Sequence, residues 1–101
     1  MKLLLVTVVE EYHKDILKLF KKAQIENFSE SDIDGYKTTS SNLSVSNWFS
    51  SVKGSAESRL FFSFTDDEKI EDLFNLIEVF NENLETNNPI KAVVVPIEKF
   101  I

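Results

Sequence analysis

The sequence predicts one α+β domain whose elements follow the order β-α-β-β-α-β. Apolar runs open and close the chain, at residues 3–9 and 90–97. Between them, two stretches with the hydrophobic spacing of helices alternate with strand-like stretches. A chain of 101 residues is long enough for one hydrophobic core and too short for two. We therefore expect a single domain over residues 1–101.

The first half of the chain predicts a strand, a helix and a second strand. Residues 3–9 are continuously apolar and β-branched, which is typical of a strand covered on both faces. The next stretch has apolar residues at the spacing of one buried helix face: Ile16, Leu19, Phe20 and Ala23. Residues 27–36 are the weakest strand prediction, because acidic side chains interrupt them, and they end at Asp34-Gly35, a turn signal.

The second half predicts a strand, a helix and a closing strand. Residues 59–64 alternate as a strand does, and Thr65 with Glu68 has the spacing of a capping box at a helix start. Helical spacing then runs from Ile70 to Leu84, and the last strand spans residues 90–97. The order is that of a ferredoxin-like sandwich, a four-stranded antiparallel sheet with two helices on one face.

Composition excludes several classes of function. The chain has no cysteine, so it lacks a thiol nucleophile and a cysteine zinc site. A formal net charge of −6 argues against nucleic acid as a partner, because neutralising phosphates requires clustered Lys and Arg. The opening apolar run ends at Glu10-Glu11 with no cleavage site, and no segment approaches a membrane span. We expect a cytoplasmic protein that does not insert into a membrane.

One face of the predicted sheet needs a partner. Two helices cover only one face of four strands, yet the first and last strands are apolar on both faces. Phe61 also points opposite to Leu60 and Phe62. A second copy of the chain is the simplest cover for such a face, so we expect a homo-oligomer.

A long loop separates the two middle strands. Residues 37–58 are rich in serine and threonine, and connections of this length are uncommon unless they are functional or disordered. Four apolar residues inside it have helical spacing: Val45, Trp48, Phe49 and Val52. One interpretation is a segment that folds back onto the body. The other is a mobile segment that becomes ordered on a protein partner, since aromatic side chains supply much of the contact energy at interfaces.

A few side chains are candidates for chemistry. His13, the only histidine, has acidic neighbours in sequence and is read either as a metal ligand or base or as a surface histidine. Glu30, Asp32 and Asp34 recur at period two, so they are expected on one strand face, where they would bind a hard cation or form a solvated edge. No nucleophile elbow, phosphate loop, dinucleotide fingerprint or zinc-protease motif is present, so no catalytic residue is predicted.

Three stretches resemble the PII signal-transduction family. Residues 1–9 are similar to its opening strand, and Ile33-Asp34-Gly35-Tyr36 resembles the close of its second strand before the mobile T-loop. Residues 91–98 resemble its final strand. The resemblance implies a cytosolic homotrimer that binds effectors, commonly adenine nucleotides, between subunits. It also implies that the loop binds a partner protein, such as a membrane transporter.

The resemblance implies ligand-site residues, but the sequence departs from the family at that site. Gly35, Tyr36 and Lys37 match the base of the T-loop, and Lys91 matches a lysine that contacts nucleotide phosphate. Residues 85–91 lack the glycines of the family's phosphate loop, and residues 37–39 lack its glutamine for 2-oxoglutarate. The family's usual ATP and 2-oxoglutarate sensing is therefore not expected, and the effector stays unidentified.

Three functions follow from these observations. The leading one is a non-catalytic, trimeric PII-like regulator whose loop 37–58 binds a protein in response to a small ligand. The second is a divalent-metal-responsive trimer resembling the cation-tolerance family, whose aromatic-rich motifs are absent here. The third is a small ferredoxin-like enzyme, although helix faces lined by Leu and Phe offer no polar residue to a cleft.

Overall fold

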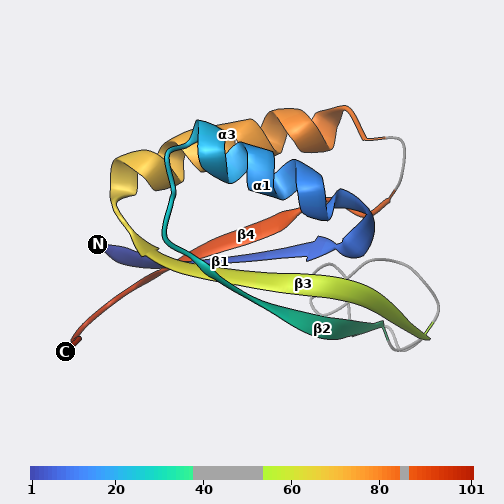
Figure 1. Ribbon diagram of the computed structural model, residues 1–101, viewed down its shortest axis with the longest axis horizontal. Helices are drawn as coiled ribbons and strands as arrows, with labels where there is room; N and C mark the ends of the chain where they lie inside the picture. The colour runs from blue at the N-terminus through green and yellow to red at the C-terminus, as the bar shows by residue number, and fades with distance from the viewer. Residues whose placement is uncertain (38–53, 85–86) are drawn as a thin grey trace.

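The protein is a four-stranded sheet with two helices packed on one face (Figure 1). The computed structural model describes residues 1–37, 54–84 and 87–101. Its elements are β1 (Lys2–Val9), the 3-10 turn η1 (Glu10–Tyr12), α1 (His13–Lys22), β2 (Ser29–Lys37), β3 (Gly54–Thr65), α3 (Asp67–Glu82) and β4 (Lys91–Pro96). The predicted β-α-β-β-α-β order and the ferredoxin-like fold class are confirmed.

The sheet order is β2-β3-β1-β4, and every neighbouring pair is antiparallel. The edge strands are thus β2 and β4, while β1 lies in the centre. In the register of the sheet, Val6 is opposite Phe61 on one side and Ala92 on the other. Because paired residues of antiparallel strands share a face, this register assigns every strand residue to the helix-covered face or to the opposite face.

The core lies between the helices and the covered face of the sheet. Phe20 of α1 and Phe61 of β3 are fully buried and meet edge to face, with ring centroids 5.2 Å apart. Such a pair adds to the stability gained from burying two large apolar side chains. Around them pack three residues of β1, two more of α1 and two of α3: Leu4, Val6, Val8, Ile16, Leu19, Leu73 and Ile77.

The opposite face of the sheet is apolar and carries no helix among the described residues. It is called the open face here. By register it presents seven apolar residues of β1, β3 and β4: Leu3, Leu5, Leu60, Phe62, Phe64, Val93 and Val95. Phe64 is 57% exposed and Val95 40% exposed. Phe61 and Phe62 point to opposite faces, as the alternation in the sequence predicts.

The two middle strands extend into the segment that the sequence assigns to the loop. β2 includes Lys37, and β3 begins at Gly54 rather than at residue 59. Tyr36 pairs with Ser55 and Lys37 with Gly54, so the two strands continue as a ribbon past the end of β1. The pairing satisfies the backbone hydrogen-bonding groups of these residues, although their side chains show no strand pattern in the sequence.

The ends of α3 also differ from the prediction. The helix begins at Asp67 with Asp66 at the N-cap, and no side chain caps it, so the predicted capping box of Thr65 and Glu68 is wrong. Asp67 and Glu68 in the first turn still complement the helix dipole. The helix ends at Glu82, before Leu84, because the backbone N–H of Asn83 turns back to Phe80.

Candidate functional site

Arg59 is the centre of a cluster of charged side chains on the covered face of the sheet. β3 directs its guanidinium past the end of the helices, where it bonds Glu10 of η1 at 2.9 and 3.1 Å. Glu30 and Asp32 of β2 lie 3.0 and 3.2 Å from the same guanidinium. The hydrogen bond to Glu10 contributes most to raising the pKa of Arg59 above its ordinary value, and Glu30 and Asp32 add to it.

His13 joins this cluster from the first residue of α1. Its Nε2 lies 2.7 Å from Glu30 Oε2, and its Nδ1 lies 3.8 Å from Glu10 Oε2. The imidazole stacks on Phe61, with ring centroids 5.9 Å apart and planes 20° apart. The structure therefore brings His13 and Glu30 together, which their distance in sequence does not predict.

The acidic residues of β2 share one face, as their period-two spacing predicts. Glu30 is opposite Phe61, Asp32 opposite Arg59 and Asp34 opposite Glu57. Within the part of the chain that the structure describes, no three His, Cys, Asp or Glu side chains form a group that could hold a metal ion. The guanidinium of Arg59 occupies the position between the carboxylates that a metal cation would need. We interpret the cluster as an ion-pair network.

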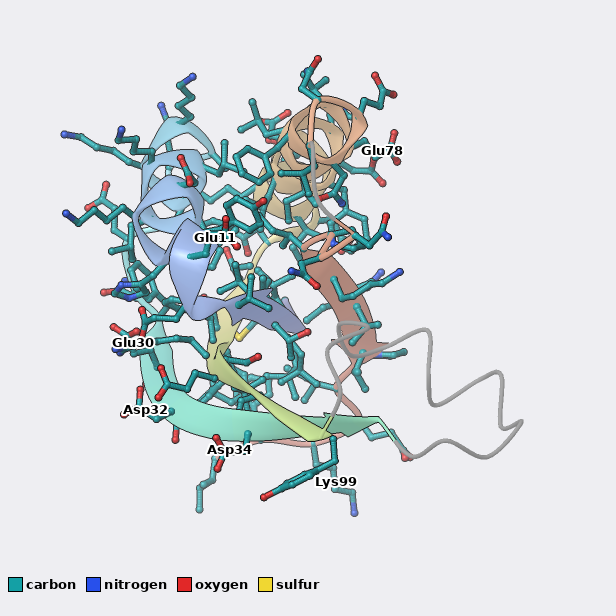
Figure 2. All side chains as sticks on the ribbon, turned by 90° about the vertical axis from the view of Figure 1, so that its right-hand side faces the viewer. Glu11, Glu30, Asp32, Asp34, Glu78 and Lys99 are labelled. Carbon is teal, nitrogen blue, oxygen red and sulfur yellow. The ribbon has the colours of Figure 1, made fainter. Side chains whose placement is uncertain are left out.

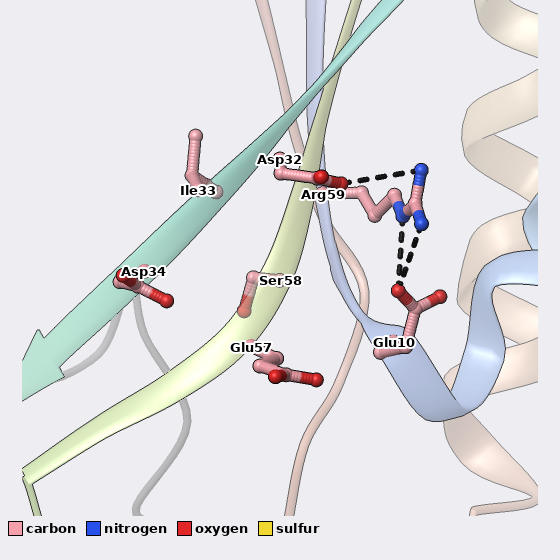
Figure 3. A pocket seen from close by; sticks show the side chains of 7 residues that line it. All are labelled: Glu10, Asp32, Ile33, Asp34, Glu57, Ser58 and Arg59. Atoms are coloured by element: carbon pink, nitrogen blue, oxygen red, sulfur yellow. Dashed lines mark hydrogen bonds and ion pairs between the residues drawn. The ribbon is translucent and has the colours of Figure 1, made fainter.

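A cavity of about 420 Å³ opens beside Arg59 (Figure 3). Its lining is strongly polar and comes from η1 and the β2–β3 ribbon: Glu10, Asp32, Ile33, Asp34, Glu57, Ser58 and Arg59. Four carboxylates and one guanidinium line it. The cavity therefore has an excess of negative charge, which disfavours an anionic ligand.

A second hollow, of about 440 Å³, lies at the start of β2, where β3 continues past its partner strand. Three aromatic residues line it, Phe28, Phe62 and Phe64, together with polar residues of the same two segments. The rings of Phe62 and Phe64 are perpendicular, with centroids 6.3 Å apart. Phe62 and Phe64 are exposed, whereas Phe28 is partly buried against Phe20 and Phe61 of the core.

The four residues that the resemblance assigns to a ligand lie on the two opposite edges of the sheet. Gly35 and Lys37 belong to β2, and Tyr36, between them, is 61% exposed. Lys91 opens β4 opposite Thr7 and is half-buried. Two strands separate these edges, so one subunit does not bring the four residues into one site. They would meet only across an interface between copies.

A side-chain amide fixes the start of β4. Asn81 of α3 accepts a hydrogen bond from the backbone N–H of Ile90 at 2.8 Å and donates one to its carbonyl at 2.9 Å. Ile90 is 2% exposed, so both of its backbone groups depend on this amide. The amide positions Lys91, the next residue. Sequence reasoning missed Asn81, because a polar residue in an apolar helical pattern has no distinctive spacing.

The apolar residues predicted to bind a partner lie outside the described residues. These are Val45, Trp48, Phe49 and Val52 of the predicted loop. The structure describes the ribbon from which that segment departs and returns (Figure 1). Partner binding by the segment stays a prediction.

Solved structures with this fold include two PII-like proteins. One is CPII, a nitrogen regulatory PII-like protein from Thiomonas intermedia K12, bound to ADP, AMP and bicarbonate; the TM-score is 0.63 at 11% identity, over 99% of this chain and 94% of that one. The other is described as a PII-like signalling protein from Thermus thermophilus, with a TM-score of 0.63 at 11% identity, over 95% of this chain and 85% of that one. No protein-family model and no curated protein matches the sequence.

The fold and the order of its elements therefore define a protein of the PII-like fold class. The resemblance predicted from three short stretches is confirmed at the level of the fold. In the described residues, no helix is long and apolar enough to cross a membrane.

Proposed function

We propose that this chain is a non-catalytic, cytoplasmic regulatory protein of the PII-like kind. It assembles as a homotrimer through the open face, binds a small ligand between subunits, and binds a partner protein, such as a membrane transporter, through segment 37–58. The observation that supports this most is the arrangement of the sheet. An apolar open face lies between two edges that each carry part of the ligand site implied by the resemblance.

The open face supports assembly because removing its exposed apolar side chains from water is favourable in free energy. Phe62 and Phe64 are 37% and 57% exposed, and Val95 of the edge strand is 40% exposed. Burying such side chains yields about 25 cal/mol per Å² of apolar surface. A second copy supplies a face of the same kind and also places its own β2 or β4 edge beside the first subunit.

The ligand that the site supports best is an adenine nucleotide with one or two phosphates. Tyr36 at the end of β2 is 61% exposed and offers an aromatic ring for a planar base. Lys91 of another subunit would supply a cation for phosphate. CPII, which has the same fold, binds ADP and AMP. Residues 85–91 lack glycine, so close backbone approach around a longer phosphate chain is disfavoured.

Calorimetry with ADP and with AMP tests the ligand. We expect micromolar to submillimolar binding that weakens at least tenfold in Lys91→Ala, since a charge-assisted contact contributes about 1.5–3 kcal/mol. Lys99→Ala is the matched control, because it removes an exposed lysine beyond β4 (Figure 2). Equal loss in both variants, or no binding of either nucleotide by the assembled protein, would contradict this assignment.

A further inference from the structure

The outward face of α1 is a stripe of lysines. Its buried residues Ile16, Leu19 and Phe20 point toward the sheet. Helical spacing places four exposed lysines on the opposite side: Lys14, Lys18, Lys21 and Lys22. Among the described residues, the basic side chains that contact carboxylates are those of Lys2, His13 and Arg59, and none of these four lysines does so.

The outward face of α3 is a stripe of acidic residues. Ile70, Leu73 and Ile77 are its buried side. Five exposed carboxylates lie around the remainder of the helix: Glu68, Glu71, Asp72, Glu78 and Glu82. None of them belongs to an ion pair between described residues, whereas Asp67 pairs with Lys2 at 3.2 Å. The single lysine of this helix, Lys69, is half-buried at the margin of the stripe.

The helices α1 and α3 lie side by side and antiparallel in one layer (Figures 1 and 2), so the two stripes are neighbours. Tyr12 meets Phe80 with ring centroids 5.4 Å apart, so the start of α1 is level with the last turn of α3. Leu76 and Phe80 are partly buried and face α1, and Val79 beside them is 58% exposed. An apolar seam therefore separates a basic stripe from an acidic one.

This pattern selects against a uniformly charged partner. An anionic lipid surface or a nucleic acid attracted to the lysines of α1 would meet the carboxylates of α3 in the same plane. Repulsion there would offset the attraction. The surface fits a partner that carries the opposite pair of stripes at the same separation.

We propose that the helix layer pairs with the helix layer of a second copy of this chain, about a two-fold axis that runs along the seam. A rotation of 180° about that axis places α1 of each copy over α3 of the other. Both opposite-charge contacts then form at once, and the two Val79 side chains approach each other. A two-fold axis across the helices would instead place lysines over lysines, so the charge pattern specifies one orientation.

The lengths of the stripes agree with this arrangement. At 1.5 Å per residue, the stripe from Lys14 to Lys22 is about 12 Å long, and the stripe from Glu68 to Glu82 is about 21 Å long. The Tyr12–Phe80 contact sets the level of the two helices. It brings the partner subunit's Lys14 level with Glu78 and Glu82, and the partner subunit's Lys22 level with Glu68 and Glu71.

The pairing does not depend on the assembly proposed above. It uses the helix side of the molecule, whereas that assembly uses the open face of the sheet, so a chain can make both contacts. The two differ in their response to salt. Exposed ion pairs are screened, while apolar burial is not weakened by added salt.

Sedimentation at two salt concentrations tests the helix pairing. We expect the mass at 25 mM NaCl and about 100 µM protein to be at least double that of the species present in 0.5 M NaCl, because each chain of a trimer carries its own helix layer. Lys18→Glu reverses one charge at the centre of the α1 stripe. Because the two paired chains are related by a two-fold axis, the reversal occurs at two places in the interface. It is expected to weaken the doubling at least tenfold, because attraction is replaced by repulsion at two symmetric places. Lys99→Glu makes the same change of net charge away from the helices and should leave the doubling unchanged.

Two outcomes would overturn this inference. One is the same mass at both salt concentrations for the wild-type chain. The other is equal loss of the doubling in Lys18→Glu and Lys99→Glu, which would show an effect of net charge alone. The mass in 0.5 M NaCl reports separately on the open-face assembly, so failure of one proposal is distinguishable from failure of the other.

Discussion

Replacing Asn81 with alanine removes both hydrogen bonds that fix the start of β4. The amide of Asn81 is the partner of the Ile90 N–H and carbonyl, at 2.8 and 2.9 Å. Ile90 is 2% exposed and belongs to the core, so water does not readily replace the lost partner. The variant leaves two buried backbone groups unsatisfied next to Lys91.

The expected cost follows from those two groups. An unsatisfied buried donor or acceptor costs about 1–3 kcal/mol, and partial relaxation of the segment after α3 lowers the sum. We expect Asn81→Ala to reduce the free energy of unfolding by about 2–4 kcal/mol. For a domain of this size, that is a fall in Tm of roughly 10 °C or more.

Urea unfolding followed by circular dichroism measures this loss, and the chain offers a matched control. Asn83 donates a side-chain hydrogen bond to the carbonyl of Val79 at 2.9 Å, but on the exposed end of the helix. Asn83→Ala should therefore cost less than about 1 kcal/mol. Equal losses in the two variants, or a loss below about 0.5 kcal/mol in Asn81→Ala, would refute the view that this amide holds β4 in place.

Three further predictions concern the charged cluster, the predicted loop and the ligand. Arg59→Gln leaves Glu10, Glu30 and Asp32 without their shared cation, so its Tm should be lower than that of the wild type. The difference in Tm should be smaller in 1 M NaCl, because salt screens the repulsion between the carboxylates. The double variant Trp48→Ala, Phe49→Ala should keep the stability and the assembly of the wild type, while its free energy of binding to the partner falls by at least about 2 kcal/mol. If the double variant fails to fold, the two aromatic residues belong to the core instead. Magnesium-ATP should bind weakly or not at all in calorimetry, and a micromolar Kd would contradict the reasoning from the glycine-free segment 85–91.

Hydrophobic spacing was sufficient to predict the fold. Leu4, Val6 and Phe61 occupy the buried face because strand side chains alternate, and Ile16 and Phe20 do so because helix side chains recur every turn. Those periodicities are local, so they can be read from the sequence. The polar strand β2 was the weakest prediction, since its acidic residues face solvent and Arg59 rather than the core.

The candidate site was predicted less well, because its contacts join residues that are distant in sequence. His13 and Glu30 are 17 residues apart, and Arg59 and Glu10 are 49 apart. Only the pairing of β3 with β1 and β2 brings them together. The extra length of β2 and β3 was also missed, because serine and glycine on an exposed ribbon carry no hydrophobic alternation. The ribbon is stabilised by the backbone pairing of β2 with β3.

The most direct test of the account is the mass of the assembled protein in 0.5 M NaCl, measured by sedimentation for the wild type and two variants. Phe64→Glu places a charge on the open face, at a residue that is 57% exposed in the single chain. Val79→Glu does the same on the helix side, at a residue that is 58% exposed. We expect a trimer for the wild type and for Val79→Glu, and a folded monomer for Phe64→Glu. A wild-type monomer at micromolar concentration, or a trimer that Phe64→Glu leaves unchanged, would contradict it.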